Sequence, residues 1–95
     1  MGQAVPTARA TASICNTRGL HARASAKFVK LASGFEAEIR VTREGSTVDA
    51  RSIMGLLMLG AGMGSAIDIS ADGTDAVAAV AALGELVARR FDEDQ

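Results

Sequence analysis

Residues 17–23 have the sequence TRGLHAR and contain His21, the only histidine of the chain. Before this stretch, residues 9–14 alternate small apolar and polar side chains, as a half-buried strand does. After it, residues 22–35 place apolar side chains at near-helical spacing. The stretch therefore marks a strand-to-helix junction, and we expect His21 in the first turn of the helix.

This position makes His21 the candidate functional residue. The first turn of a helix presents backbone N–H groups without partners inside the helix, at the positive end of the helix dipole, so it suits anions. We expect this environment to favour the neutral imidazole, whose unprotonated nitrogen is a nucleophile near neutral pH. A phosphoryl group on that nitrogen can be held by the same N–H groups and by the guanidinium of Arg23. Local features alone are also compatible with a capping or surface histidine.

The rest of the chain alternates between strand and helix periods. The predicted strands cover residues 9–14, 36–43, 47–49 and 66–71, and the predicted helices cover residues 22–35, 53–59 and 76–91. Strands with one wet face and helices on the other define an α+β fold, an open-faced β-sandwich in the order βαββαβα. Residues 1–7 are expected to form a flexible tail, and residues 92–95 (DEDQ) a solvated acidic end outside any site.

Two helix starts carry capping signals. Ser52 is the predicted N-cap of the helix at residues 53–59, and Thr74 with Asp75 is expected to cap the last helix. The helix at residues 53–59 is apolar on nearly all sides, so one sheet face cannot cover all of its side chains. The pattern leaves two interpretations open, a docking surface and plain core packing.

Composition limits the function classes. The 95 residues suit one domain, residues 1–95, with 48% apolar residues and a net charge of −1. A near-neutral chain with three Phe and no Trp or Tyr is a poor partner for nucleic acid. Cys15, the sole cysteine, is expected to be a small buried residue at a strand end, and we expect no disulfide, metal site or cofactor. No segment suggests a signal peptide or membrane insertion, so the expected location is cytoplasmic.

Two motifs carry a resemblance to a known family. GLHAR at residues 19–23 and RSIMG at residues 51–55, followed by Leu59-Gly60, resemble HPr, the histidine-containing phosphocarrier family of the phosphoenolpyruvate-dependent phosphotransferase system. The resemblance runs from about Ala8 to Phe91 and keeps both motifs in order and at the right distance. It implies an antiparallel four-stranded sheet covered by three helices, the middle one short.

The resemblance also implies a function. His21 would accept a phosphoryl group on Nδ1 from phosphorylated Enzyme I and pass it to a downstream EIIA-type acceptor, with Arg23 stabilising the phosphate. Such a carrier is a protein substrate of Enzyme I rather than a stand-alone enzyme. Ser52 matches the position phosphorylated by HPr kinase/phosphorylase. The residues that match the family's docking surface for Enzyme I are Ile53, Met54 and Leu57.

One departure and one alternative accompany this interpretation. Ala24-Ser25 stands where the family usually has Pro-Ala, and losing that proline is expected to loosen the first turn slightly. The alternative is a regulatory binding module whose phosphorylation state controls a kinase, transcription factor or transporter. A plain structural domain is a second alternative. The sequence leaves both the sugar-uptake branch and the nitrogen-related regulatory branch of the family open.

Overall fold

The computed structural model describes residues 5–95. Its elements are β1 (Thr7–Ser13), α1 (Ala22–Ala32), β2 (Glu38–Arg43), β3 (Ser46–Asp49), α2 (Ile53–Met58), β4 (Ala66–Asp72), α3 (Ala76–Ala88) and a short 3-10 turn, η1 (Arg90–Asp92). The predicted order βαββαβα is confirmed. The tail predicted at residues 1–7 is too long, because Thr7 already pairs with Asp72; residues 1–4 lie outside the described residues.

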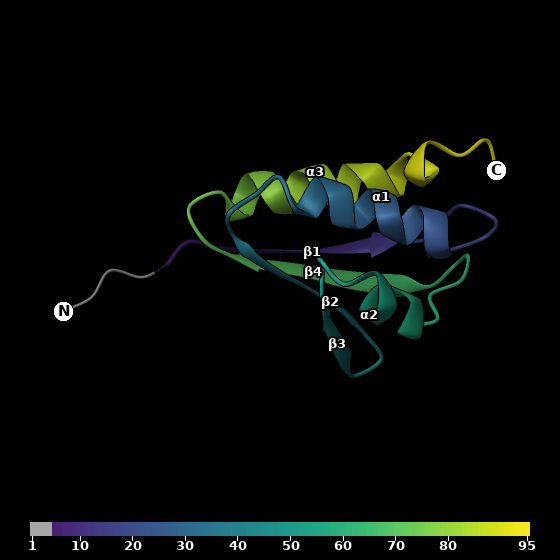
Figure 1. Cartoon of the computed structure of the whole chain (residues 1–95), viewed down its shortest axis with the longest axis horizontal. Helices are drawn as coiled ribbons and strands as arrows, with labels where there is room; N and C mark the ends of the chain where they lie inside the picture. Colours follow the sequence, from purple (N-terminus) through teal and green to yellow (C-terminus); the bar gives the residue numbers. More distant parts are fainter. Residues whose placement is uncertain (1–4) are drawn as a thin grey trace.

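All strand pairs are antiparallel, and the sheet order is β1-β4-β2-β3. Figure 1 shows α1 and α3 side by side on one face of this sheet. Helix α2 packs against α1 and against β3 at the sheet edge. The start of α1, helix α2 and the C-terminus all lie at the right-hand end of Figure 1. The expected open-faced sandwich with three helices is confirmed.

The predicted alternation of the strands decides which side chains enter the core. Ile39 and Val41 of β2 and Ile67 and Ile69 of β4 are fully buried under the helices. The opposite face is polar, and there Thr11 of β1 donates a 2.6 Å hydrogen bond to Asp68 of β4. One wet and one dry face follow because successive side chains of a strand point to opposite sides.

The β2–β3 hairpin turns at Glu44-Gly45, where φ is 48° and 84°. Two consecutive left-handed residues match the twist of a two-residue hairpin, and glycine adopts this conformation without the penalty of a Cβ atom.

Asp75 corrects the predicted capping of the last helix. It occupies the N-cap of α3 but makes no side-chain capping bond. Its carboxylate instead accepts two hydrogen bonds of 2.8 Å, from the backbone amides of Glu36 and Ala37. Asp75 therefore ties the segment before β2 to the start of α3.

Helix α1 ends at Ala32, and α3 ends at Ala88, three residues earlier than its predicted end at residue 91. After α3, Arg90, Phe91 and Asp92 have φ of 59°, 54° and 62°. This left-handed turn directs the Phe91 ring into the core, where it is fully buried, and its carbonyl accepts a 2.7 Å bond from Lys27 of α1. The turn sends the end of the chain back toward the start of α1.

Candidate functional site

His21 is the N-cap of α1, one residue before the helix begins. Its Nδ1 accepts a 3.2 Å hydrogen bond from the backbone N–H of Arg23. A ring nitrogen that accepts a hydrogen bond carries no proton, so these partners assign the proton of the neutral ring to Nε2. The predicted position at the helix start is confirmed, and the nitrogen aimed at the helix amide is Nδ1.

The second ring nitrogen of His21 meets the acidic end of the chain. Nε2 lies 2.5 Å from Oε2 of Glu93, and the two side chains are only 14% and 18% exposed. The prediction that residues 92–95 are merely solvated is therefore wrong. The left-handed turn at Arg90–Asp92 places Glu93 over the ring, and no periodicity in the sequence could have indicated this.

Asn16 holds the other oxygen of Glu93. Its Nδ2 donates to Oε1 of Glu93 at 3.0 Å and to the carbonyl of Gly19 at 2.8 Å, and the Asn16 side chain is fully buried. Burial is the largest single influence on the Glu93 carboxyl and raises its pKa, but the hydrogen bonds from Asn16 and His21 outweigh it. The pKa of Glu93 therefore lies below its usual value. Sequence reasoning missed Asn16, whose only signal is that asparagine is common in turns.

The loop before His21 is fixed at several points. The amide of Thr17 donates to the carbonyl of Gln95 at 3.1 Å, and the amide of Leu20 donates to the carbonyl of Ala61 at 2.9 Å. Ser25 is buried, and its hydroxyl donates a 3.1 Å bond to the Leu20 carbonyl. The serine beside Ala24 thus adds a hydrogen bond between the loop and the first turn of α1.

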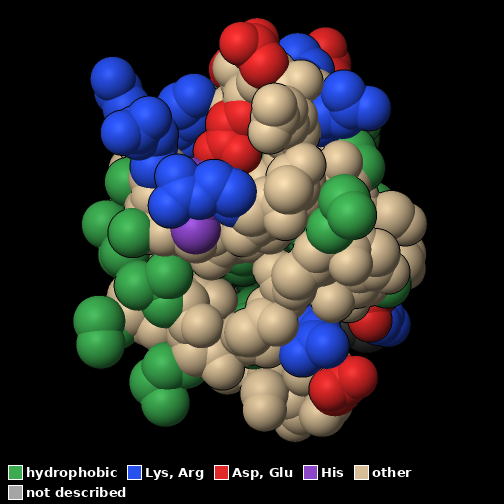
Figure 2. Space-filling view, turned by 90° about the vertical axis from the view of Figure 1, so that its right-hand side faces the viewer, with side chains coloured by type: hydrophobic (Ala, Val, Ile, Leu, Met, Phe, Trp, Pro, Cys, Tyr) green, Lys and Arg blue, Asp and Glu red, His purple; other side chains and the backbone are tan. Residues whose placement is uncertain are grey.

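Basic side chains lie beside Glu93, the residue that contacts the imidazole. Arg18, Arg23 and Lys27 line a shallow basin of about 420 Å³ together with the residues of the acidic end. Figure 2 shows the purple histidine directly below blue basic side chains, with red carboxylates beside them. Arg23 contacts the ring through its backbone amide, and its exposed guanidinium borders the basin. The role predicted for that guanidinium stays a prediction.

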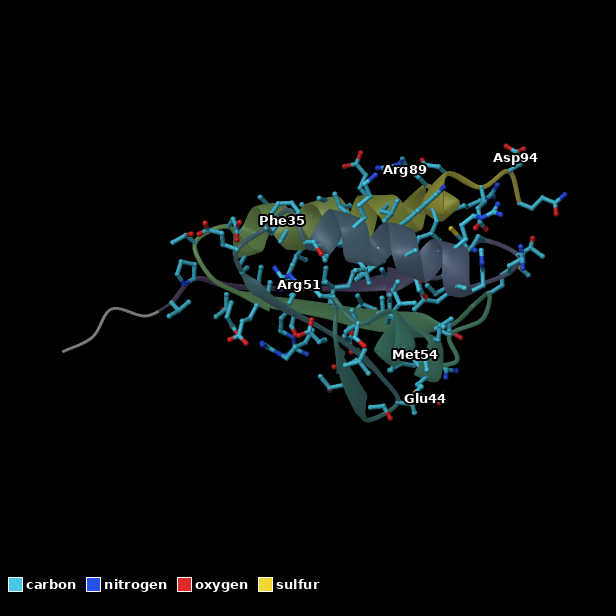
Figure 3. All side chains as sticks on the ribbon, in the orientation of Figure 1. Phe35, Glu44, Arg51, Met54, Arg89 and Asp94 are labelled. Atoms are coloured by element: carbon cyan, nitrogen blue, oxygen red, sulfur yellow. The ribbon has the colours of Figure 1, made fainter. Side chains whose placement is uncertain are left out.

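Ser52 caps α2 as predicted, since its Oγ accepts a 2.9 Å bond from the amide of Gly55. The helix behind it presents an apolar patch, which we define as Ile53, Met54, Leu57 and Met58. The expectation that some of these side chains stay exposed is confirmed, and Figure 3 labels Met54 on this helix.

Cys15 is exposed rather than buried, and its Sγ lies 3.5 Å from the carbonyl of Val87. The prediction failed because Cys15 follows β1 on the side of the chain opposite to the buried Ile14. Among residues 5–95, no group of three His, Cys, Asp or Glu side chains could hold a metal ion. Within the same residues, no helix has the length and apolar character needed to cross a bilayer.

The sandwich fold places the one histidine of the sequence at a helix start, which defines a small α+β protein with a single imidazole at the end of α1. The family model described as "PTS HPr component phosphorylation site" matches residues 8–89, which include both motifs. The chain therefore belongs to the HPr family, the phosphocarriers of the phosphotransferase system. The resemblance stated from GLHAR and RSIMG is confirmed.

Individual relatives agree. The phosphocarrier protein HPr of Cupriavidus necator is 48% identical over 87% of this chain and 93% of its own length. The phosphocarrier protein NPr of Shewanella violacea is 48% identical over 85% of this chain and 89% of its own. A crystal structure of HPr from Thermoanaerobacter tengcongensis has a TM-score of 0.89 at 40% identity, covering 93% of this chain and 99% of that one.

Proposed function

We propose that His21 is the phosphoryl-accepting residue of this HPr family member. It takes the group on Nδ1 from phosphorylated Enzyme I and passes it to an EIIA-type acceptor. In the transfer, a bond forms between Nδ1 and phosphorus while the bond from phosphorus to the donor atom breaks, and its electron pair leaves with the donor. The observation that carries the proposal is the unprotonated Nδ1 at the amide end of α1. Its lone pair accepts a 3.2 Å bond from the Arg23 amide, and it can bond to phosphorus once that amide donates to a phosphate oxygen instead.

The surroundings of Nδ1 suit a phosphoryl group. Once phosphorus is bound to Nδ1, its oxygens can accept from the Arg23 amide and from the guanidinium of Arg23. A helix end contributes about 0.3–1 kcal/mol, and up to about 2 kcal/mol when partly buried. That amount tunes the exchange between partners without trapping the group. Phosphoryl transfer depends mainly on positioning and charge stabilisation, which the partner enzymes can complete.

The test is incubation of the chain with phosphoenolpyruvate and Enzyme I, followed by an assay for acid-labile, base-stable phosphate. We expect label on the wild type and on Ser52→Ala, and none on His21→Ala. Label on His21→Ala would contradict the assignment. Adding an acceptor separates a relay from the regulatory alternative, because a relay passes the label on, whereas a switch keeps it until hydrolysis. The acceptor labelled in a cell extract identifies the branch of the system.

We further propose that Ser52 is a regulatory site, phosphorylated by HPr kinase/phosphorylase. Ser52 is partly exposed at the start of α2, where the helix end is expected to tolerate a phosphate. A phosphate adds about two negative charges beside the apolar patch. We expect slower phosphorylation of His21 in Ser52→Asp and in the phosphoserine form. Rates equal to that of the unmodified wild type in both forms would remove this proposal.

The apolar patch is the proposed docking surface for Enzyme I, with Ile53, Met54 and Leu57 at its centre. Met54→Glu should raise the KM for Enzyme I, because the charge must be desolvated on docking. Val77→Glu on α3 is the matched control, since Met54 and Val77 are both 68% exposed. Equal KM values in the two variants would exclude docking through α2.

We also propose that this phosphoryl exchange takes place in the cytoplasm, with family membership as the support.

A further inference from the structure

Both ring nitrogens of His21 are engaged, and phosphoryl transfer through Nδ1 uses only one of them. Nε2 is bound to Glu93 at 2.5 Å, a contact that joins residues 72 positions apart. The Glu93 carboxylate is not a freely exposed group, because its side chain is only 18% exposed and its second oxygen accepts a hydrogen bond from Asn16.

We propose that Glu93 is a positioning residue for phosphoryl transfer at His21. By accepting the hydrogen bond from Nε2–H, it keeps the lone pair on Nδ1 and holds the ring against the start of α1. The inference rests on the proposed role of His21 as the phosphoryl acceptor.

The supports of Glu93 make it a fixed acceptor rather than a mobile one. Its Oε1 accepts from the buried Asn16, which also donates to the Gly19 carbonyl in the loop before His21. On either side of Glu93, the Phe91 ring is buried in the core and the Gln95 carbonyl accepts from Thr17. A partner held on both sides loses little conformational freedom when it orients the imidazole.

The chemistry gives this contact a second effect. When Nδ1 bonds to phosphorus and the donor bond breaks, Nε2 keeps its proton, so the ring becomes a cation. Glu93 then faces a charged Nε2–H, and a charge-assisted hydrogen bond is stronger than a neutral one. A carboxylate plays the same two parts for the imidazole of a Ser-His-Asp triad, fixing its tautomer and stabilising the imidazolium without taking the proton. When the phosphoryl group leaves, the ring returns to its starting tautomer.

Three variants test the proposal. Glu93→Ala removes the acceptor, Glu93→Gln keeps an acceptor oxygen but loses the charge, and Glu44→Gln removes the same charge from the exposed β2–β3 turn. Figure 3 labels Glu44 on the hairpin, well away from Asp94 in the acidic end. Each protein is measured twice, by 15N NMR of the imidazole and by the initial rate of phosphorylation with Enzyme I. Backbone amide spectra establish that each variant is folded.

We expect the wild-type ring at high pH to be protonated on Nε2, and Glu93→Ala to show a larger share of the Nδ1–H tautomer. Removing outer carboxylates from metal-bound histidines costs about 10-fold to 100-fold in affinity or activity, and we expect a similar fall in rate for Glu93→Ala. Glu93→Gln should be intermediate, and Glu44→Gln should match the wild type.

An unchanged or faster rate in Glu93→Ala would overturn the proposal, and so would an unchanged tautomer. The same loss in Glu44→Gln would also overturn it, because net charge would then be the cause. These outcomes differ from failure of the proposed function. If His21 takes no phosphate in the wild type, the phosphorylation assay fails, whereas the tautomer measurement still reports whether Glu93 orients the ring.

Discussion

Gly19 sits where the loop before His21 comes closest to the segment after α2. Its φ is +65°, and a Cβ atom there would lie 2.5 Å from the carbonyl oxygen of Ala61 and 2.8 Å from Cα of Gly62. Both atoms belong to backbone, so no side-chain rotation can relieve the overlap. Replacing Gly19 with alanine should therefore destabilise the protein through strain and through overlap.

The two contributions can be estimated separately. A left-handed conformation costs a residue with a Cβ atom about 1–2 kcal/mol. Forcing an extra methyl group into a packed region costs about 1–3 kcal/mol more. The expected loss for Gly19→Ala is thus about 2–5 kcal/mol, a large part of the roughly 5–15 kcal/mol that stabilises a typical domain.

Gly60→Ala is the matched control, because Gly60 has a φ of +63° and nothing within 4 Å of the added Cβ atom. It should lose only the conformational part, about 1–2 kcal/mol. Urea unfolding followed by circular dichroism measures both free energies of unfolding. Equal losses of unfolding free energy in Gly19→Ala and Gly60→Ala would refute this reasoning, because the contact of the added methyl group with residues 61 and 62 would then cost nothing. Slower phosphorylation of His21 in Gly19→Ala alone would show that the same approach also positions the site.

Other predictions concern single polar side chains. Arg51→Met should lower the free energy of unfolding in urea by about 1–3 kcal/mol, because the guanidinium donates to three backbone carbonyls between residues 32 and 37. Figure 3 labels Arg51 near Phe35. An Arg51→Lys variant that is as stable as Arg51→Met would show that the positive charge alone contributes nothing. Ser52→Ala should cost about 1 kcal/mol through the lost cap, whereas Ser52→Asp should stay near the wild type, and equal losses would contradict the capping role. The amide of Glu36, followed by other backbone amides, lowers the pKa of Asp75, so its stabilising contribution is present above the usual aspartate pKa and is lost as the pH falls through the lowered value. The difference in unfolding free energy between wild type and Asp75→Asn should therefore shrink on acidification, and a difference independent of pH would contradict this.

Local sequence was enough for features that depend on neighbours along the chain. The alternation that buries Ile39 and Ile67 was predicted because side chains of a strand switch faces at every residue. The cap at Ser52 was predicted because capping depends on a few adjacent residues. The helix start beside His21 was predicted because apolar side chains follow a near-helical spacing from residue 22 onward. The motifs around those two residues also identified the family before any geometry was known.

Only the tertiary structure brought Glu93 onto His21 and Asp75 onto the amides before β2. The first contact depends on a left-handed turn at Arg90–Asp92, built from residues that rarely adopt it and held by burial of Phe91. Periodicity tells which side of an element a residue faces. Which distant side chains finally meet depends on how the whole chain packs. For this reason the acidic end, which the sequence predicted to be solvated, is part of the site.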